Sequence, residues 1–161
     1  MNNTLITAET ILLNFEAGSK EDAIHKLCGH LFLNKLTQNP SKLYDDIIAR
    51  ENIVSTFAGC QTAIPHTITA HVDQPVLCFA RIKDPVITWN GRDEDVVFVL
   101  LLCAPITGDL KELRKSQSYV FSAVAQLISQ PDVLARWAQA DLPQTILDDL
   151  QHAFAENQKQ Q

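Results

Sequence analysis

His66 is the residue whose type and setting are best suited to chemistry in this chain of 161 residues. It follows Pro65 directly. Proline fixes its own φ and biases the residue before it, Ile64, toward an extended conformation. We therefore expect the His66 side chain at a defined place, at the end of a strand or in a tight loop. A neutral imidazole is available as a nucleophile near pH 7, and phosphoryl transfer is one reaction that it could perform.

Groups that could hold a phosphoryl group lie close to His66 in the sequence. A guanidinium fork binds phosphoryl oxygens bidentately, and hydroxyl groups add neutral donors. Arg50 supplies such a guanidinium, directly before Glu51. The hydroxyl groups are those of Ser55, Thr56, Thr62 and Thr67.

Each of these residues also has a purely structural explanation when it is taken alone. A histidine after a proline is more often structural than reactive, and Arg50 could simply place its charge at a helix C-terminus. The order of the residues from Arg50 to His66 favours the functional interpretation. Because no H-E-x-x-H motif, Cys/His cluster or glycine-rich phosphate loop is present, we expect no metal and no nucleotide cofactor.

Composition narrows the classes of partner. The net charge of −6 argues against nucleic-acid binding, which requires a basic stripe, and favours a partner with a basic face. The four cysteines form no C-x-x-C pair, which predicts reduced thiols in a cytoplasmic protein. The longest apolar run, Val96 to Pro105, is too short to cross a bilayer, and the N-terminus has no signal-peptide pattern. We therefore expect no membrane insertion.

Periodicity and turn signals predict the elements that must position His66. Apolar residues at helical spacing predict helices from 19 to 35, from 40 to 50, from 109 to 127, from 131 and from 143. Apolar runs predict strands at 10–15 and 75–82, a short edge strand at 85–89 and a central strand at 96–103. Asn90-Gly91 predicts a turn that makes part of the sheet antiparallel.

This pattern predicts an α/β fold in one domain covering residues 1–161, with a polar, frayed tail at 156–161. The sheet is expected to be mixed but mostly parallel, with about five strands and with helices on both faces.

The order of residues before His66 resembles the enzyme IIA domain of the mannitol/fructose class of the bacterial phosphoenolpyruvate-dependent sugar phosphotransferase system, and its nitrogen-regulatory relative. That family carries an Arg-Glu, then a Ser-Thr, then a glycine-rich approach to Ala-Ile-Pro-His. The matching stretch here is Arg50-Glu51-Asn-Ile-Val-Ser55-Thr56-Phe-Ala-Gly59-Cys-Gln-Thr-Ala63-Ile64-Pro65-His66. Later matches are Pro75-Val76, Pro85-Val86 before Trp89, and Asp95-Val96-Val97-Phe98.

The resemblance implies a mannitol-type IIA fold and a set of roles. His66 would accept a phosphoryl group from the histidine phosphocarrier protein and pass it to a cysteine of a IIB domain, which works with a membrane IIC. Arg50 would be the phosphate-binding cation, with Ser55, Thr56 and Thr67 in support. No metal or cofactor would be required. Which nitrogen of His66 reacts, and which sugar is transported, are left open.

One departure from the family falls at Asp109. Many members have a second histidine at this place in a His-Leu-x-x-Leu motif, whereas this chain has Asp109-Leu110-Lys111-Glu112-Leu113. An aspartate would repel a phosphoryl group unless it orients the His66 ring through a hydrogen bond to the other ring nitrogen. The glycines before Ala63 are also partly replaced.

Two alternatives to a transport role stay open. The first is a regulatory IIA-like protein, whose phosphorylation state controls its contacts with a transporter, a kinase or a transcription regulator. The second is an interaction module on the same scaffold that takes no phosphate. We expect the partner surface to be apolar around His66, with Phe57 and Ile68 as contact residues.

Overall fold

The structure is a computed structural model that describes residues 5–83, 86–106 and 109–159. The chain divides into two compact units, Met1–Ile106 and Thr107–Gln161. His66 and Arg50 belong to the first unit, and Asp109 belongs to the second. The prediction of a single domain over residues 1–161 stays a prediction.

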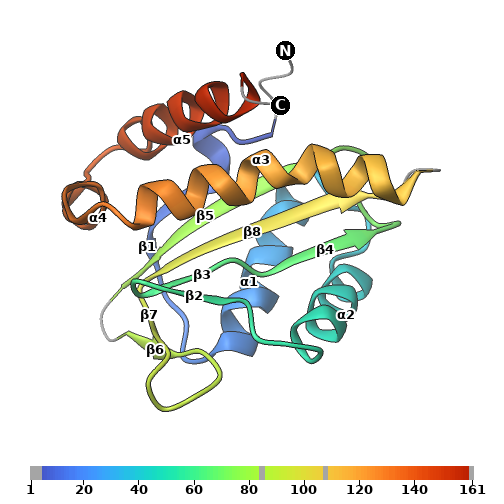
Figure 1. The fold of residues 1–161 in the computed structure, drawn as a ribbon. Helices are drawn as coiled ribbons and strands as arrows, with labels where there is room; N and C mark the ends of the chain where they lie inside the picture. Colours follow the sequence, from blue (N-terminus) through green and yellow to red (C-terminus); the bar gives the residue numbers. More distant parts are fainter. Residues whose placement is uncertain (1–4, 84–85, 107–108, 160–161) are drawn as a thin grey trace. The chain divides into compact units, whose positions relative to one another are not determined.

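Two helices and eight strands make up the described part of the first unit (Figure 1). After a short 3-10 turn at Ala8–Thr10, they are β1 (Ile11–Phe15), α1 (Lys20–Leu33), α2 (Pro40–Glu51), β2 (Phe57–Gly59), β3 (Thr62–Ala63), β4 (His66–Thr69), β5 (Val76–Ile82), β6 (Ile87–Thr88), β7 (Asp95–Val96) and β8 (Phe98–Pro105).

The predicted helices and long strands are confirmed to within a few residues. The sequence accounts for the helix starts. The Ser19 hydroxyl accepts from the Asp22 N–H as the N-cap of α1, and the Asn39 side chain does the same for Lys42 at the start of α2. Pro40 occupies the first turn of α2, where its missing N–H costs no hydrogen bond. The short strands β2, β3 and β4 were not predicted.

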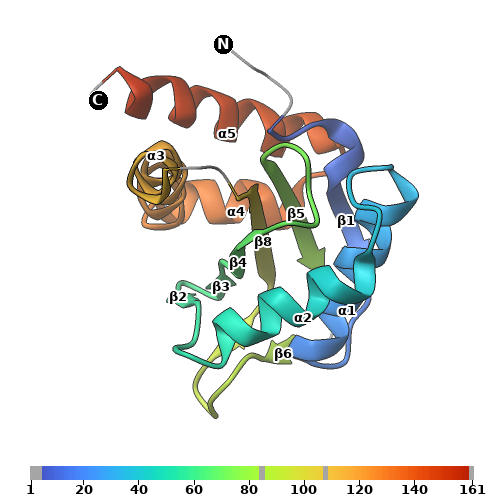
Figure 2. The same ribbon diagram turned by 90° about the vertical axis from the view of Figure 1, so that its right-hand side faces the viewer.

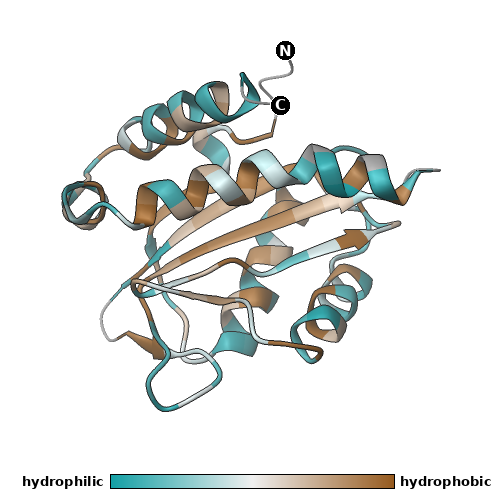
Figure 3. Ribbon diagram, in the orientation of Figure 1, coloured by the Kyte–Doolittle hydropathy of each residue, from teal (hydrophilic) through white to brown (hydrophobic). Residues whose placement is uncertain are grey.

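The main sheet has six strands, where we expected about five. Among the described residues, β1 pairs with β5, and β3 and β4 pair with β8, all in parallel. The pairs β5–β8 and β2–β3 are antiparallel. The sheet is therefore mixed and mostly parallel, as predicted. The apolar strand β8 is central and is buried from Phe98 to Ala104, and Figure 3 shows it in brown along most of its length.

Helices α1 and α2 cover one face of this sheet (Figure 2). Alternate residues of β5 and β8 pack against the apolar sides of both helices, because successive side chains of a strand point to opposite faces. The cluster includes Ile24, Leu27, Leu43, Ile47, Val76, Ala80, Val99 and Leu101. Cys28, Cys78 and Cys103 lie in the same cluster as free thiols, whose pKa values are raised by burial. The packing fixes the position of α2, which carries Arg50.

The antiparallel pair predicted around Asn90-Gly91 is present as the β6–β7 hairpin, in which Ile87 pairs with Val96. It forms a separate sheet of two strands rather than part of the main sheet. Pro85, where the sequence places the start of the first strand, lies outside the described residues.

The second unit consists of α3 (Leu110–Ile128), α4 (Pro131–Gln139) and α5 (Pro143–Gln158). The prediction of a frayed tail from residue 156 was wrong as far as Gln158, because α5 continues to that residue. Asn157 is buried, and its side-chain amide donates to the Ala153 carbonyl and to the Gln126 side chain. These two bonds hold the last turn of α5 in place.

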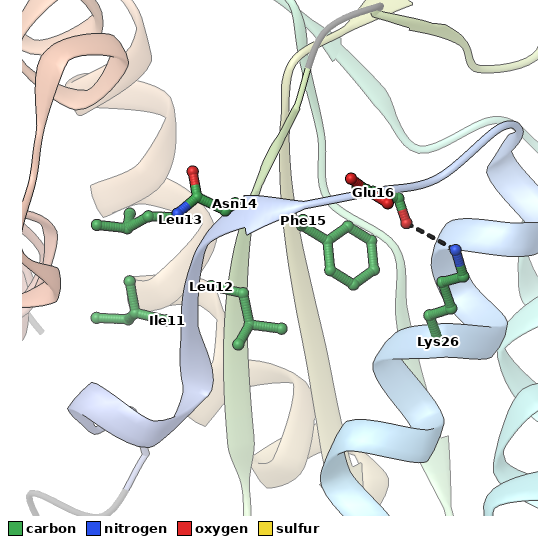
Figure 4. A pocket seen from close by; sticks show the side chains of 7 residues that line it. All are labelled: Ile11, Leu12, Leu13, Asn14, Phe15, Glu16 and Lys26. Atoms are coloured by element: carbon green, nitrogen blue, oxygen red, sulfur yellow. Dashed lines mark hydrogen bonds between the residues drawn. The ribbon is translucent and has the colours of Figure 1, made fainter.

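A pocket of about 480 Å³ runs along the edge strand β1 (Figure 4). Leu12 and Phe15 point toward the α1 side of the strand, where the Lys26 ammonium donates to the Glu16 carbonyl. The lining residues are Ile11 to Glu16 and Lys26. None of them belongs to the set that the sequence singles out around His66.

Candidate functional site

His66 is the first residue of β4, immediately after a break in the pairing along β8. Thr62 and Ala63 of β3 pair with Phe98 and Val99, and the pairing resumes with His66 opposite Leu102. Pro65 lies in the break, and it has no N–H to donate to a strand ladder. Its carbonyl accepts from the Leu102 N–H at 3.0 Å. We expected the histidine at the end of a strand or in a tight loop, and it stands at the beginning of a short strand.

The carbonyl oxygen of Ile64 fixes the orientation of the imidazole. Nδ1 of His66 lies 2.8 Å from this oxygen. Because a carbonyl only accepts hydrogen bonds, Nδ1 carries the proton in this contact. The neutral ring then has its lone pair on Nε2. The contact therefore distinguishes the two ring nitrogens, which the sequence left undecided.

The His66 ring is half-buried, so it is reachable but partly shielded from water. Burial lowers the pKa of the imidazole below its usual value, and the nearby charge of Arg50 lowers it further. The Ile64 carbonyl and the Glu51 carboxylate act in the opposite direction. The net effect favours the neutral, nucleophilic form of the ring at pH 7.

Arg50 lies in the last turn of α2 and is half-buried. One nitrogen of its guanidinium, Nη1, donates to the Val54 carbonyl at 3.1 Å, and the Arg50 carbonyl accepts from the Ile53 N–H. The loop after α2 thus turns back around the arginine. Arg50 is close enough to His66 for its charge to affect the pKa of the ring. The structure therefore places Arg50 within electrostatic reach of His66.

Glu51 is a buried carboxylate whose role the sequence argument missed. Its side chain is 3% exposed and accepts three hydrogen bonds. The donors are the Thr56 N–H at 2.8 Å, the Thr56 hydroxyl at 2.5 Å and the Trp89 indole N–H at 3.0 Å. A buried carboxylate requires such partners, because an unpaired one is costly. The sequence signals were the charge next to Arg50 and the Arg-Glu pair of the family motif.

The three hydroxyl residues expected to support the phosphoryl group, Ser55, Thr56 and Thr67, fall into two kinds. Ser55 and Thr56 end the loop around Arg50: the Thr56 hydroxyl donates to Glu51, and the Ser55 hydroxyl donates to Glu94 at 3.0 Å. These bonds give them a supporting place in the site. Thr67 is buried and follows His66 in β4, so its side chain points to the opposite face of the strand. A direct contact of the Thr67 hydroxyl with a group on His66 is therefore not supported by this geometry.

Asp109 directly precedes α3 and is exposed. Its carboxylate accepts from the Lys111 N–H at 3.0 Å, and its carbonyl accepts from the Leu113 N–H. It therefore caps the helix in the way that aspartate commonly does. Because it belongs to the second unit, an influence of Asp109 on the His66 ring stays a prediction.

Apolar side chains are exposed beside the site, in the loop that surrounds Arg50. Ile53 is 79% exposed and Val54 is 61% exposed. Figure 3 shows this loop in brown directly after α2. Phe57 and Ile68, the contact residues named from the sequence, are half-buried. Exposed apolar residues next to a reactive group are typical of a protein interface.

Residues 5–83, 86–106 and 109–159 contain no group of three or more His, Cys, Asp and Glu side chains that could hold a metal ion. No helix within these ranges has both the length and the apolar character that crossing a membrane requires.

Comparison with known proteins places the chain in a family. The model of the family described as "Phosphoenolpyruvate-dependent sugar phosphotransferase system, EIIA 2" matches residues 4–153. A mannitol-specific phosphotransferase enzyme IIA component from Halalkalibacterium halodurans is 37% identical over 103 residues, which is 60% of this chain and 67% of that protein.

Longer proteins also match. Multiphosphoryl transfer protein 2 of Escherichia coli is 31% identical over 148 residues, which is 92% of this chain. The chain spans only 12% to 17% of the length of the multiphosphoryl transfer proteins that it matches.

Solved structures share the fold at lower sequence identity. Nitrogen regulatory protein IIA-Ntr from Neisseria meningitidis has a TM-score of 0.78 and 22% identity, covering 92% of this chain and 97% of that chain. A complex of enzyme IIAMTL and phosphorylated enzyme IIBMTL from Escherichia coli matches with a TM-score of 0.70 and 18% identity, covering 91% of this chain and 96% of that chain. These likenesses show the fold, and the family match over residues 4–153 shows that the chain belongs to the EIIA 2 family of the phosphoenolpyruvate-dependent sugar phosphotransferase system.

Proposed function

We propose that this protein is a phosphoryl carrier that takes a phosphoryl group on Nε2 of His66. One observation carries the proposal: the half-buried His66 ring is fixed through Nδ1 by the Ile64 carbonyl, with the Arg50 charge close by. This arrangement leaves a defined lone pair on Nε2 next to a cation suited to phosphoryl oxygens.

The reaction follows from these groups. The Nε2 lone pair attacks the phosphorus of a phosphohistidine on the donor. The phosphorus–nitrogen bond of the donor breaks, and its electron pair returns to the donor ring, which leaves as neutral imidazole because it keeps a proton on its other nitrogen. Arg50 balances negative charge on the phosphoryl oxygens in the transition state. The proton on Nδ1 of His66 stays in its bond to the Ile64 carbonyl throughout. In the second step a thiolate of the acceptor attacks the same phosphorus and releases the His66 ring.

The partners that fit are the histidine phosphocarrier protein as donor and a cysteine of a IIB domain as acceptor. Both transfers would take place in the cytoplasm, and a membrane IIC would carry the sugar. The structural relative solved as a complex of enzyme IIAMTL and phosphorylated enzyme IIBMTL supports the second partner. The exposed side chains of Ile53 and Val54 supply the apolar contact surface beside His66.

The direct test is incubation with phosphoenolpyruvate, enzyme I and the phosphocarrier protein. We expect a mass gain of one phosphoryl group in the wild type and no gain in His66→Ala. His71→Ala is a matched control, because it removes a second half-buried imidazole from the same unit. Absence of a gain in the wild type, or an equal gain in His66→Ala, would refute the proposal.

A regulatory role is the second candidate. Two observations favour it: the structural likeness to nitrogen regulatory protein IIA-Ntr, and Asp109 at the place where many relatives have a second histidine. In this case phospho-His66 forms but is not discharged by a IIB domain. Mixing the phosphorylated protein with purified IIB domains of the mannitol and fructose classes separates the two roles. Rapid loss of the phosphoryl group to a IIB cysteine supports transport, and its retention supports regulation.

A further inference from the structure

The middle of the loop after α2 buries little apolar surface, and hydrogen bonds hold its two ends. Asn52, Ile53 and Val54 are all exposed. Burial of apolar side chains therefore contributes little to the conformation of this loop. Yet the loop carries the Val54 carbonyl, which accepts the hydrogen bond from the Arg50 guanidinium. Whatever fixes the two ends of the loop also fixes this contact.

Both ends of the loop are bonded to the β6–β7 hairpin. At the α2 end, Glu51 accepts from the indole N–H of Trp89, which is 3% exposed and directly follows β6. At the other end, the Ser55 hydroxyl donates to the Glu94 carboxylate, directly before β7. Glu51 also accepts from Thr56, so the residues at the two ends of the loop are bonded to each other.

The hairpin is itself held by hydrogen bonds, both within its turn and to α1. The Trp89 N–H donates to the Glu94 carbonyl at 2.7 Å, and the Glu94 N–H donates to the Gly91 carbonyl at 2.9 Å. The ammonium of Lys20, a buried residue at the start of α1, donates to the Asn90 side chain at 3.2 Å. The turn is thus connected to α1 as well as to the end of α2.

We propose that the β6–β7 hairpin is a positioning element for the phosphoryl site, acting through Glu51 and Ser55 on the loop that holds Arg50. Trp89, Glu94 and Glu51 are then positioning residues, and none of them contacts the phosphoryl group. This inference rests on the proposed phosphoryl transfer to His66. Small displacements of a group that binds the transition state lower the rate strongly.

Trp89→Phe tests the proposal, because it removes the indole N–H and keeps an apolar ring. We expect kcat for phosphoryl gain on His66 to fall about tenfold, with KM for the phosphocarrier protein near the wild-type value. The second unit offers a matched control. There the Trp137 indole N–H donates to the Asp149 carboxylate at 2.8 Å, so Trp137→Phe removes the same kind of bond. We expect Trp137→Phe to lower stability and leave kcat unchanged.

A double-mutant cycle shows whether Trp89 acts through Arg50. In an Arg50→Ala background, Trp89→Phe should cause no further loss of kcat. If it lowers kcat by the same factor in both backgrounds, Trp89 does not act through Arg50 and the proposal is wrong. A wild-type kcat in Trp89→Phe also overturns it.

Glu94→Ala tests the other attachment if Trp89→Phe does not fold, because Glu94 is less buried. We expect a loss of kcat, restored in Glu94→Gln, which keeps a carbonyl oxygen to accept from Ser55. Equal rates in wild type and Glu94→Ala would contradict the proposal. The wild-type protein distinguishes a failure of the proposed function from a failure of the positioning role. If it gains no phosphoryl group, the proposed function itself is wrong; if it gains one and the hairpin variants match it, only the positioning role is wrong.

Discussion

The Thr69 hydroxyl donates to the Asp46 carboxylate across 2.6 Å and so joins β4 to α2. Asp46 and Arg50 are four residues apart on α2 and therefore share one face of the helix. His66 and Thr69 are the first and last residues of β4. The bond between Asp46 and Thr69 thus ties α2, which carries Arg50, to β4, which begins with His66.

Thr69→Val should lower both stability and the rate of phosphoryl gain. Thr69 is 1% exposed, and its hydroxyl also accepts from the His71 N–H at 3.0 Å. Losing these bonds is expected to reduce the free energy of unfolding by about 1–2 kcal/mol, measured by urea denaturation. Thr69→Ser keeps the hydroxyl and should retain most of the rate. A rate in Thr69→Val equal to that of the wild type would show that this bond does not set the position of Arg50.

Arg50→Ala should lower kcat for phosphoryl gain by about 100-fold or more, because it removes the cation from the developing charge on the phosphoryl oxygens. Arg50→Lys should recover only part of this loss, since an ammonium lacks the planar fork. Arg50 is half-buried and bonded to one carbonyl, so both variants should fold. Stopped-flow measurement with the phosphorylated phosphocarrier protein checks the rates. Equal rates for Arg50→Lys and the wild type would exclude bidentate binding.

The phosphoryl group should be attached to Nε2 of His66 and not to Nδ1. The Ile64 carbonyl accepts from Nδ1, and a phosphoryl group on that nitrogen would break this bond and leave the carbonyl without the ring as its donor. Nitrogen-15 NMR of protein labelled at histidine distinguishes the two isomers. A coupling between phosphorus and Nδ1 would refute the assignment. It would mean that the ring leaves its contact with the Ile64 carbonyl on phosphorylation.

The sequence could predict the parts of the site that depend on local patterns. Pro65 restricts the backbone before His66, and the apolar face of α2 ends next to Arg50, so both residues could be named in advance. The phosphate-binding role of Arg50 and the carrier role of His66 rest on the family resemblance and on the proposal above. The long strands β5 and β8 followed from their apolar runs in the same way.

What could not be predicted depends on contacts between distant residues. Trp89 lies 38 positions from Glu51, and no local pattern links an indole N–H to that carboxylate. The strands β2, β3 and β4 are two to four residues long, too short for a period to appear. The contact between His66 Nδ1 and the Ile64 carbonyl could not be predicted either, because a backbone acceptor leaves no trace in the sequence.

The pH dependence of phosphoryl gain should reflect the lowered pKa of His66. Burial and Arg50 shift this pKa below the usual value of about 6.5, so the neutral ring persists to lower pH than in the unfolded chain. As the pH is lowered, the rate should therefore begin to fall at a lower pH than it would for a histidine with the usual pKa. The free energy of unfolding should also decrease as the pH is lowered. Between the folded pKa and about 6.5 the unfolded chain binds the proton more readily, so stability decreases as the pH falls through this window.

Arg50→Ala should move the His66 titration toward higher pH, because it removes a nearby positive charge. Proton NMR of the ring, followed from pH 8 to pH 4.5, measures the shift. Lys42→Ala is the matched control: it removes a positive charge from an exposed position in the first turn of the same helix and should leave the titration unchanged. If Arg50→Ala also leaves it unchanged, or lowers the pKa, Arg50 does not act on the ring electrostatically.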